Sequence, residues 1–280
     1  MIILAGNLLV IFVVSTTLSL HTPMYIFLSQ LSLSDIFLTS TICPNTLLVI
    51  LYDGSTISKV GCITQAFAFS VSMATECLLL TMMSYDRYVA ICKPMHYVTT
   101  INLTFCMQLI MFSWALGSFL TIIIIVLISS LDFCGSNVMI NHFFCDYGPL
   151  LQLSCSDTSV LEIVVLIIAA HESIIETMFI FSTYVCIVRS IQKISTTTVK
   201  KKALSTCTSH LTVVCMCFGS IFAIYVSPSG KKSFSMNKIF SLLYTVLTPL
   251  LNPIIYSLKN QEFRIIIKKK IITLRQILTN

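Results

Sequence analysis

The chain has 280 residues, of which 56% are hydrophobic and only 10% are charged, and its formal net charge is +6 at pH 7. Its mean hydropathy is +0.93. A soluble domain of this size needs far more polar surface to cover itself, so the composition excludes that class and predicts that most of the chain faces lipid or other membrane-buried helices.

Seven apolar stretches follow one another along the chain. Each is too long for a barrel strand and none alternates with period two, and in lipid the backbone groups must be satisfied within each segment, so we expect helices. The first lacks a basic start and a cleavage site, and we interpret it as a truncated span rather than a signal peptide. The predicted spans are 2–18 (truncated), 25–50, 62–88, 103–130, 161–188, 203–226 and 238–258.

The fold class is therefore predicted to be an all-α membrane protein. Residues 1–280 form a single seven-transmembrane helix bundle, and the last stretch, 260–278, mixes Ile and Leu with lysines. That mixture is typical of a short amphipathic helix at the membrane interface, held by anionic lipid. A disordered basic tail is the alternative.

Basic side chains near span ends predict the orientation. One set of loops is rich in them and is expected to be cytoplasmic, which places the N-terminus outside and the C-terminus inside a multi-pass plasma-membrane protein. The opposite set carries Lys59, Lys231, Lys232 and Lys238. The rich set carries Arg87, Lys93, Arg189, Lys193, Lys200, Lys201, Lys202, Lys259, Arg264, Lys268, Lys269, Lys270 and Arg275.

Four of the twelve cysteines fall on the predicted outer side: Cys62, Cys134, Cys145 and Cys155. An even number in an oxidising compartment indicates two disulfides, although the sequence allows three pairings. A metal site around Cys145, using His142 and Asp146, is disfavoured because a disulfide would consume the thiolate.

Two carboxylates lie mid-span, Asp35 in the second predicted helix and Glu76 in the third. Ionisable groups at that depth are functional candidates. With Ser34, Ser72 and Asn252 nearby, we favour a shared sodium site over a protonated, hydrogen-bonded carboxyl pair.

Glu172 and Glu176 are four residues apart on the fifth predicted helix and so share one face. Glu172 lies in the outer half of the span, where a small ligand could reach it. The alternative is that the pair only fixes helix packing.

Asp86 and Arg87 end the third predicted helix at the cytoplasmic boundary, where the arginine can snorkel and pair with its neighbour. A simple interface anchor is the alternative. The surrounding letters, "MSYDRYVAICKPMHY" (83–97), closely resemble the signature of olfactory receptors, a family of rhodopsin-like G-protein-coupled receptors. Further matches in order are "GNLLV" (6–10), "LHTPMYIFL" (20–28), "LSLSD" (31–35), "HFFCD…LSC" (142–155), "KALSTCTSHL" (202–211) and "PLLNPIIYSLKN" (249–260).

The resemblance implies a receptor, not an enzyme, that binds a small volatile odorant within the bundle and activates a stimulatory heterotrimeric G protein. Its implied partners are the odorant, that G protein and membrane lipids, with no nucleic acid and no cofactor apart from the sodium hypothesis. It implies the disulfides Cys62–Cys145 and Cys134–Cys155.

The resemblance also implies a switch at the G-protein face. At rest Arg87 is held by Asp86 and local polar groups, and agonist binding favours a state in which the sixth helix has swung outward. The switch residues it implies are Asp86, Arg87, Tyr88, Tyr184, Asn252, Pro253 and Tyr256.

Helical phase and family position together predict a mostly apolar ligand pocket. It suits a small uncharged or weakly basic molecule. Phe218 stands where the family usually shows Tyr, and Glu172 is an uncommon acid that favours an amine ligand. The predicted lining is Phe69, Ser70, Met73, Ala74, Ile168, Ala169, Glu172, Phe218, Ile221, Phe222, Tyr225, Leu242 and Thr245.

Rival functions fit less well. A transporter should show an internal repeat and interrupted helices, a channel should show a polar filter or stripe, and an enzyme should show a convergent set of catalytic groups; none is evident in the sequence. A truncated, non-signalling receptor product is the alternative closest to the favoured function.

Overall fold

Five helices of the computed structural model are long and apolar enough to cross a membrane, and two shorter apolar helices, Ile2–Ser15 and Leu243–Tyr256, accompany them. The structure describes residues 1–52, 56–133, 138–139, 143–151, 154–226, 241–259 and 261–279. The helices of the bundle are α1 (Ile2–Ser15), α2 (Pro23–Tyr52), α3 (Lys59–Cys92), α5 (Leu103–Ser129), α7 (Ser159–Gln192), α8 (Thr197–Val226) and α10 (Thr248–Lys259).

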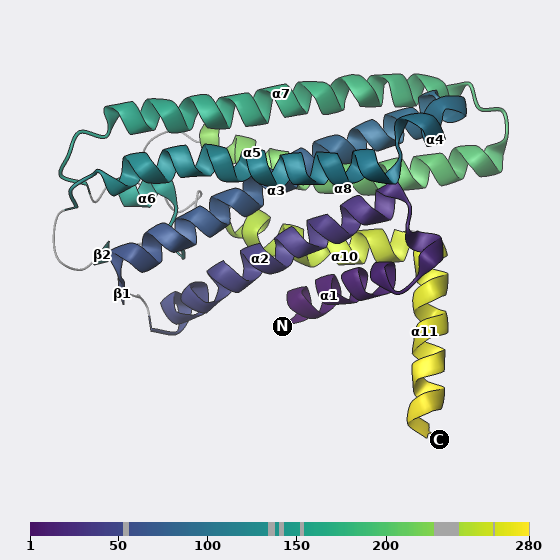
Figure 1. Cartoon of the computed structure of the whole chain (residues 1–280), viewed down its shortest axis with the longest axis horizontal. Helices are drawn as coiled ribbons and strands as arrows, with labels where there is room; N and C mark the ends of the chain where they lie inside the picture. The colour runs from purple at the N-terminus through teal and green to yellow at the C-terminus, as the bar shows by residue number, and fades with distance from the viewer. Residues whose placement is uncertain are drawn as a thin grey trace.

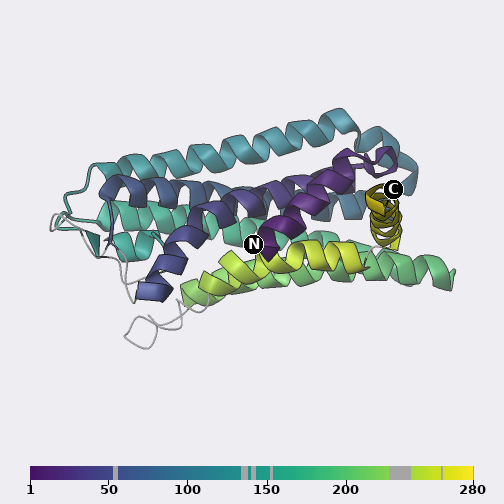
Figure 2. The same cartoon turned by 90° about the horizontal axis from the view of Figure 1, so that it is seen from below.

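The long helices run along one another in an elongated bundle (Figures 1 and 2). Shorter elements join or follow them. These are η1 (Leu18–Leu20), β1 (Thr56–Ile57), η2 (Pro94–His96), α4 (Tyr97–Thr100), β2 (Val138–Met139), α6 (Tyr147–Leu151), the π-helical segment η3 (Leu243–Leu247) and α11 (Gln261–Thr279).

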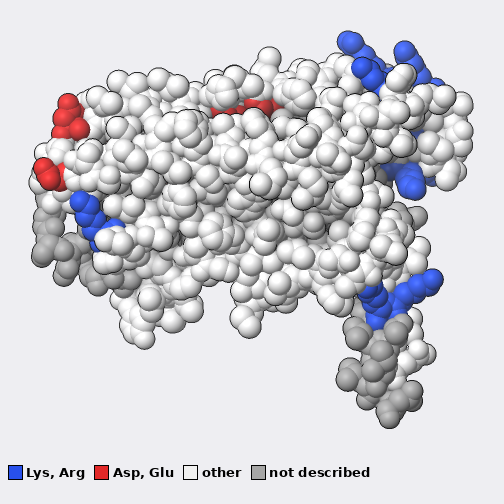
Figure 3. All heavy atoms as spheres, in the orientation of Figure 1, with Lys and Arg blue, Asp and Glu red and all other residues white. Residues whose placement is uncertain are grey.

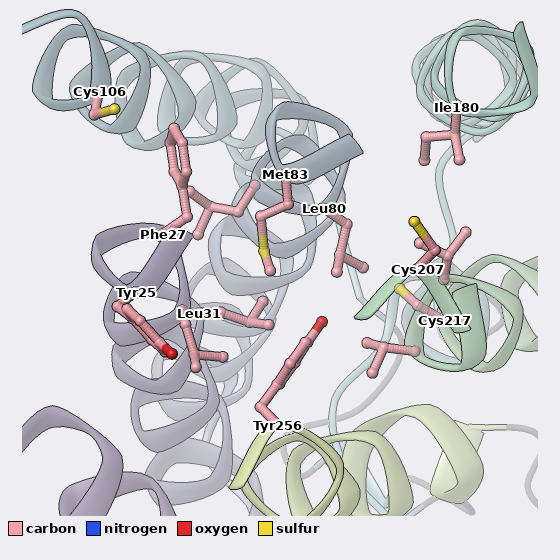
Figure 4. Packing of buried hydrophobic residues seen from close by; sticks show 14 of the residues in the cluster. Tyr25, Phe27, Leu31, Leu80, Met83, Cys106, Ile180, Cys207, Cys217 and Tyr256 are labelled. Atoms are coloured by element: carbon pink, nitrogen blue, oxygen red, sulfur yellow. The ribbon is translucent and has the colours of Figure 1, made fainter. Parts of the chain in front are cut away.

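The third long helix, α3, occupies the centre of the bundle. In its most apolar segment of 18 residues, 72% of the residues are buried, whereas in the corresponding segment of α7 only 11% are buried. Many large apolar side chains of α5 and α7 point outward, including Phe119, Leu166 and Phe181. Such a surface suits contact with lipid tails rather than water. Figure 4 shows the inner part of the core, where Leu80 and Met83 of α3 face residues of α2, α8 and α10.

Two helices exceed the thickness of a bilayer. Both α3 and α7 have 34 residues, which at ~1.5 Å per residue gives about 51 Å, against a hydrocarbon core of ~30 Å. The predicted spans 62–88 and 161–188 are therefore shorter than the helices, because apolarity reports where lipid begins and not where the helix ends. For the same reason α8 begins at Thr197, ahead of the predicted 203–226.

Local sequence fixes the helix starts. The hydroxyl of Ser58 accepts a hydrogen bond from the backbone N–H of Gly61 at 3.1 Å and so caps α3. The side-chain oxygen of Asn102 accepts from the N–H of Phe105 at 2.8 Å and caps α5. Each cap satisfies a backbone donor that has no partner within its own helix.

The first helix packs on the last span. Asn7 is fully buried, and its Nδ2 donates to the carbonyl of Pro249 in α10 at 3.0 Å and to that of Ile3 at 3.1 Å. A Cβ atom on Gly6 would lie 3.1 Å from Cγ of Pro253, so the glycine allows α1 and α10 to approach closely. Residues 16 and 17 lie beyond the end of α1, which is shorter than the predicted span 2–18.

A disulfide between Cys62 and Cys145, with Cα atoms 5.3 Å apart, ties the start of α3 to the segment before α6. Gln65 supports it, because its Oε1 accepts from the N–H of Cys145 at 2.9 Å while its Nε2 donates to the carbonyl of Thr41 at 2.8 Å. Cys155 is also disulfide-bonded; Cys134, its predicted partner, lies outside the described residues, as does His142.

The last helix, α11, runs across the axis of the bundle and away from it (Figure 1). Phe263 is fully buried and stacks on Tyr25 with ring centroids 6.0 Å apart. Lys270 hydrogen-bonds to Thr16 and lies 5.2 Å from the ring centroid of Phe12. The described part of the predicted range 260–278 is thus a helix, and its Lys270 lies next to the end of α1.

Candidate functional site

A cavity lies among α3, α5, α7, α8, η3 and the start of α6. Its empty volume is about 880 Å³ when the open space at its mouth is included. Its lining is Phe69, Ser70, Met73, Ala74, Cys77, Leu120, Thr121, Ile124, Asp146, Tyr147, Val165, Ile168, Ala169, Glu172, Ser173, Phe218, Ile221 and Tyr244.

One face of α3 forms the inner wall of the cavity. Its five lining residues fall at steps of one, three or four, which is the spacing of a single helix face. The helix is fixed at its outer end by the Cys62–Cys145 disulfide. Phe69 is buried and packs against Phe144 at 5.0 Å and Tyr244 at 5.9 Å between ring centroids. The wall is therefore positioned by both a covalent bond and aromatic packing.

The structure brings nine of the predicted pocket residues to this cavity: Phe69, Ser70, Met73, Ala74, Ile168, Ala169, Glu172, Phe218 and Ile221. Their contact with a ligand stays a prediction. Phe222 does not join them, since its side chain is 66% exposed. It follows Ile221 by one residue and is turned about 100° around α8. The side chain of Tyr225 lies outside the described part of the chain.

Two predicted residues of the last span, Leu242 and Thr245, are not among the lining residues either, and Tyr244 takes their place. The π-helical segment η3 explains the difference. A π-helix has more residues per turn than an α-helix, so counting with an α-helical period gives the wrong face. The hydroxyl of Thr245 donates to the carbonyl of Ser241 at 2.6 Å, within its own segment.

Sequence reasoning also missed the contributions of α5 and of the loop before α6. Leu120, Thr121 and Ile124 lie in a uniformly apolar run, where no periodic pattern marks an inner face. Asp146 and Tyr147 belong to the segment held by Cys145, so only the disulfide could have indicated that they reach the cavity.

Below the cavity, two contacts join its walls to the core. The thiols of Cys77 in α3 and Cys217 in α8 are 3.8 Å apart, and both residues are buried. Glu176, one turn below Glu172 on α7, is buried, and its Oε2 accepts from the hydroxyl of Thr81 at 3.3 Å. Glu176 therefore contributes to the packing of α7 on α3, which is the alternative given for this pair of acids.

The mid-span carboxylates lie close to Asn252. Asn252 donates from Nδ2 to Oδ2 of Asp35 at 2.9 Å, and Asp35, Glu76 and Asn252 are all buried. Ser34 donates to the carbonyl of Ser72 at 3.1 Å. Among the described residues, Oδ1 of Asp35, Oε1 of Glu76 and Oδ1 of Asn252 have no hydrogen-bond partner. Buried oxygens without partners are unusual, and hard cations prefer oxygen ligands, so these residues fit a cation such as sodium.

The charge pair at the inner end of α3 is arranged differently from expectation. Within the described residues no ion pair joins Asp86 to Arg87. Consecutive residues of a helix do not face each other, and Oδ1 of Asp86 instead accepts from the hydroxyl of Tyr97 in α4 at 2.8 Å. Burial, and then the neighbouring Asp86 carboxylate, raise the pKa of Tyr97, which keeps this hydroxyl a donor. In this structure Tyr97 is the hydrogen-bond partner of Asp86, and the resting-state hold of Asp86 on Arg87 stays a prediction.

Arg87 lines a second, smaller cavity with Tyr256 and Ser209, with an empty volume of about 350 Å³ including its opening. Nε of Arg87 and the hydroxyl of Tyr256 have no hydrogen-bond partner among the described residues. Tyr88 does not line this cavity; its ring centroid lies 5.7 Å from Nζ of Lys93. Pro253 lies in α10, next to Asn252, and contacts α1 near Gly6.

A buried polar chain links three helices near Arg87. The hydroxyl of Tyr184 in α7 is 2.8 Å from Nδ1 of His210 in α8, and Nε2 of His210 is 3.1 Å from the carbonyl of Leu80 in α3. His210 was not expected in the switch. Its place in "KALSTCTSHL", an otherwise small and polar run that enters a span, was the available signal.

Comparison with known proteins gives one consistent result. The sequence model described as "Olfactory receptor" matches residues 1–274. Human Olfactory receptor 6C4 is 43% identical over 278 residues, covering 98% of this chain and 89% of the relative. Human Olfactory receptor 11L1 is 44% identical over 264 residues, covering 94% and 82%. Mouse Olfactory receptor 5G9 is 42% identical over 264 residues, covering 94% and 84%.

Proposed function

This chain belongs to the olfactory receptor family, and from that premise we propose that its odorants bind in the cavity lined by α3, α5, α7 and α8. It is an odorant-sensing G-protein-coupled receptor, a seven-transmembrane bundle and a multi-pass membrane protein, and it is not an enzyme. The alternatives of a transporter or a non-signalling product find no support in these comparisons.

The cavity itself is the observation that carries the proposal. It combines an apolar lining of aromatic and aliphatic side chains with a few polar groups, including Ser70, Thr121 and Glu172. That composition is typical of sites for small organic molecules, in which apolar area provides affinity and a few polar groups fix the orientation. The lining draws on helices that must shift relative to one another for a signal to cross the membrane.

The cavity and the inner end share α3 and α8, which provides the route for coupling. Cys77 and Phe218 line the cavity, and Leu80 and His210 meet less than three turns further along the same two helices. A ligand that binds more tightly when α8 is displaced shifts the population toward that state, and only this difference in affinity drives signalling. G-protein binding must in turn tighten odorant binding.

At the inner end, Arg87 and Tyr256 are the groups that gain partners when α8 moves. Both line the small inner cavity, and each has a buried polar atom without a partner among the described residues. Displacement of α8 would widen that cavity and allow Arg87 to contact Tyr184, Tyr256 and the C-terminus of a G-protein α-subunit. We propose that the coupled partner is a stimulatory G protein. Tyr88 and Pro253 would belong to the surface at the inner end of the bundle that changes when α8 moves.

The charge distribution supports an orientation with this end in the cytoplasm. Most Lys and Arg in view lie at the end of the bundle near α4 and on α11, whereas the opposite end shows acidic side chains beside one basic patch, and a further acidic patch lies midway (Figure 3). Basic residues flank spans on the cytoplasmic side, which supports an N-terminus outside the cell. The lysines of α11 would meet anionic lipid while Ile265 and Ile272, both exposed, enter the interface.

We propose that a sodium ion binds inside the helix bundle. Asp35, Glu76 and Asn252 would hold it through the oxygens that have no partner among the described residues. A bound cation would offset the cost of burying carboxylates and would join α2, α3 and α10 in one arrangement. Its effect on signalling would come from favouring that arrangement.

The test is an odorant-panel assay in cells that express a stimulatory G protein, with cAMP as the readout and surface labelling as the measure of expression. The wild type should raise cAMP for at least one volatile, and Arg87→Ala, at matched surface level, should not. A wild type that reaches the surface and remains silent to every volatile, or an Arg87→Ala variant that signals equally well, would contradict the proposal.

A further inference from the structure

We infer that the cavity is an ammonium site, selecting small amines over neutral odorants of the same shape, with the carboxylate of Glu172 as the anchor. The inference rests on the proposed function, because it names the ligand class of the same cavity.

The first support is the charge of the lining. Glu172 and Asp146 are its ionisable acids, and no Lys, Arg or His is found among the described residues that line it. Oδ1 of Asp146 accepts from the N–H of Tyr147 at 2.7 Å, so Asp146 has a local structural role. Glu172 therefore contributes negative charge to the cavity wall, which attracts cations and repels carboxylate odorants.

The second support is the position of Glu172. The side chain is half-buried in the wall of the cavity, and with the described residues it forms neither a hydrogen bond nor an ion pair. Glu176 on the same face does have a partner, Thr81. A carboxylate away from water is costly unless it is paired. Of the two acids on this helix face, the one without a partner is the one that reaches the cavity.

The third support comes from the opposite wall. Oγ of Ser70 on α3 is buried and has no hydrogen-bond partner among the described residues, and Ser70 lines the same cavity. A buried hydroxyl without a protein partner is available to accept a hydrogen bond from a polar ligand group. An ammonium group has three N–H donors, so it can serve both the carboxylate and the hydroxyl.

The remaining lining suits the rest of such a ligand. Phe69, Phe218 and Tyr244 present aromatic rings, and the face of an aromatic ring attracts a cation. Met73 and Ile168 provide apolar contact for a hydrocarbon skeleton. The chemistry that matches all these groups together is a small primary or secondary amine, protonated at neutral pH, on a compact apolar body.

The test compares cyclohexylamine with cyclohexanol, and pentylamine with pentanol, in cAMP dose–response assays of the full chain. The variants are Glu172→Gln, which keeps shape and removes charge, and Glu162→Gln as a control. Glu162 is an exposed acid on the first turn of the same helix, and an amide oxygen can still accept its hydrogen bond from Thr158 at 2.6 Å. The wild type and Glu162→Gln should favour each amine over its alcohol by roughly tenfold or more, and Glu172→Gln should bring the ratio to about one.

A thermal-stability assay of the purified receptor with the same compounds separates ligand choice from signalling. A larger rise in melting temperature with the amine than with its alcohol, lost in Glu172→Gln, supports the ammonium site even if no compound raises cAMP. An absent cAMP response would then count against the proposed signalling alone. Amines that neither stabilise nor activate the wild type better than their alcohols, or a preference that survives Glu172→Gln, overturn the inference. Activation by the alcohols alone would leave the proposed function intact.

Discussion

The hydroxyl of Tyr184 and Nδ1 of His210 lie 2.8 Å apart, with their rings nearly parallel at an interplanar angle of 4°. The other ring nitrogen of His210 is 3.1 Å from the carbonyl of Leu80. Three helices, α7, α8 and α3, therefore meet in one buried polar chain beside Arg87. An outward displacement of the inner end of α8 must break or rearrange this chain.

Replacing Tyr184 by Phe tests that chain, because it keeps the ring and removes the hydroxyl. The change leaves Nδ1 of His210 without its partner, at a cost of about 1–3 kcal/mol. We expect a lower thermal stability of the purified receptor, since the arrangement with α8 held to α7 loses a contact. Tyr52→Phe, at an exposed site near the end of α2, is the control. Unchanged thermal stability in Tyr184→Phe would contradict a holding role.

The thiol pair Cys77 and Cys217 offers a way to lock α3 to α8. Their sulfur atoms are 3.8 Å apart, so a small approach allows a disulfide. With diamide as the oxidant, the two thiols lose two hydrogen atoms to it and form one S–S bond. We expect the odorant response to fall after diamide.

The controls for this lock are Cys77→Ala and Cys217→Ala, in which diamide should leave the response unchanged. Peptide mapping should find the Cys77–Cys217 bond in the oxidised wild type. If diamide suppresses both variants as strongly as the wild type, the effect arises elsewhere, and the proposed movement of α8 away from α3 loses this support.

Gly117 sets the distance between α5 and α3. A Cβ atom at this position would lie 3.2 Å from both Cβ of Ala74 and Oγ1 of Thr75, whereas at Gly219 nothing lies within 4 Å. Gly117→Ala requires its neighbours on α3 to shift by a few tenths of an ångström and should cost about 1–3 kcal/mol, seen as a lower melting temperature and lower surface expression. Gly219→Ala should be neutral or slightly stabilising. Equal behaviour of the two variants would show that the contact between α5 and α3 is not tight.

The sodium proposal predicts that agonist potency depends on Na⁺ in the wild type and not in Asp35→Asn. Replacing Na⁺ by choline at constant ionic strength changes the occupancy of the site while leaving screening unchanged. Asp132→Asn, at an exposed acid outside the bundle core, should respond as the wild type does. An identical sodium response of the wild type and Asp35→Asn ends the proposal.

The fold was largely accessible from the sequence because lipid imposes a simple rule. An apolar run of sufficient length must be a helix, and the expected spans found α2, α3, α5, α7 and α8 with the correct order. The ends of the helices were harder to predict from the sequence. Caps such as Ser58 and Asn102 fix them, and helices like α3 continue beyond the point where apolarity stops.

The residues that line the cavity could be predicted from the sequence where the helical phase is regular, and could not where it changes. Helical phase and family position predicted four lining residues of α3: Phe69, Ser70, Met73 and Ala74. All four line the cavity because α3 is one unbroken α-helix, in which the phase is regular. Tyr244 was missed because η3 changes the phase.

The pairing of Asp86 was missed for a different reason. Its partner, Tyr97, is eleven residues away and reaches it only through the turn formed by η2 and α4. Adjacent letters indicated an ion pair, whereas the structure shows the hydroxyl of Tyr97 as the hydrogen-bond partner of Asp86.

The most direct test of the central claim uses two neighbouring alanines of α7. Ala169 lines the cavity, and Ala170 does not. Odorant-evoked cAMP, measured at matched surface expression with an odorant that activates the wild type, should disappear in Ala169→Trp, because the indole fills the cavity, and should persist in Ala170→Trp. A response in Ala169→Trp equal to that in Ala170→Trp would show that odorants act from somewhere other than this cavity.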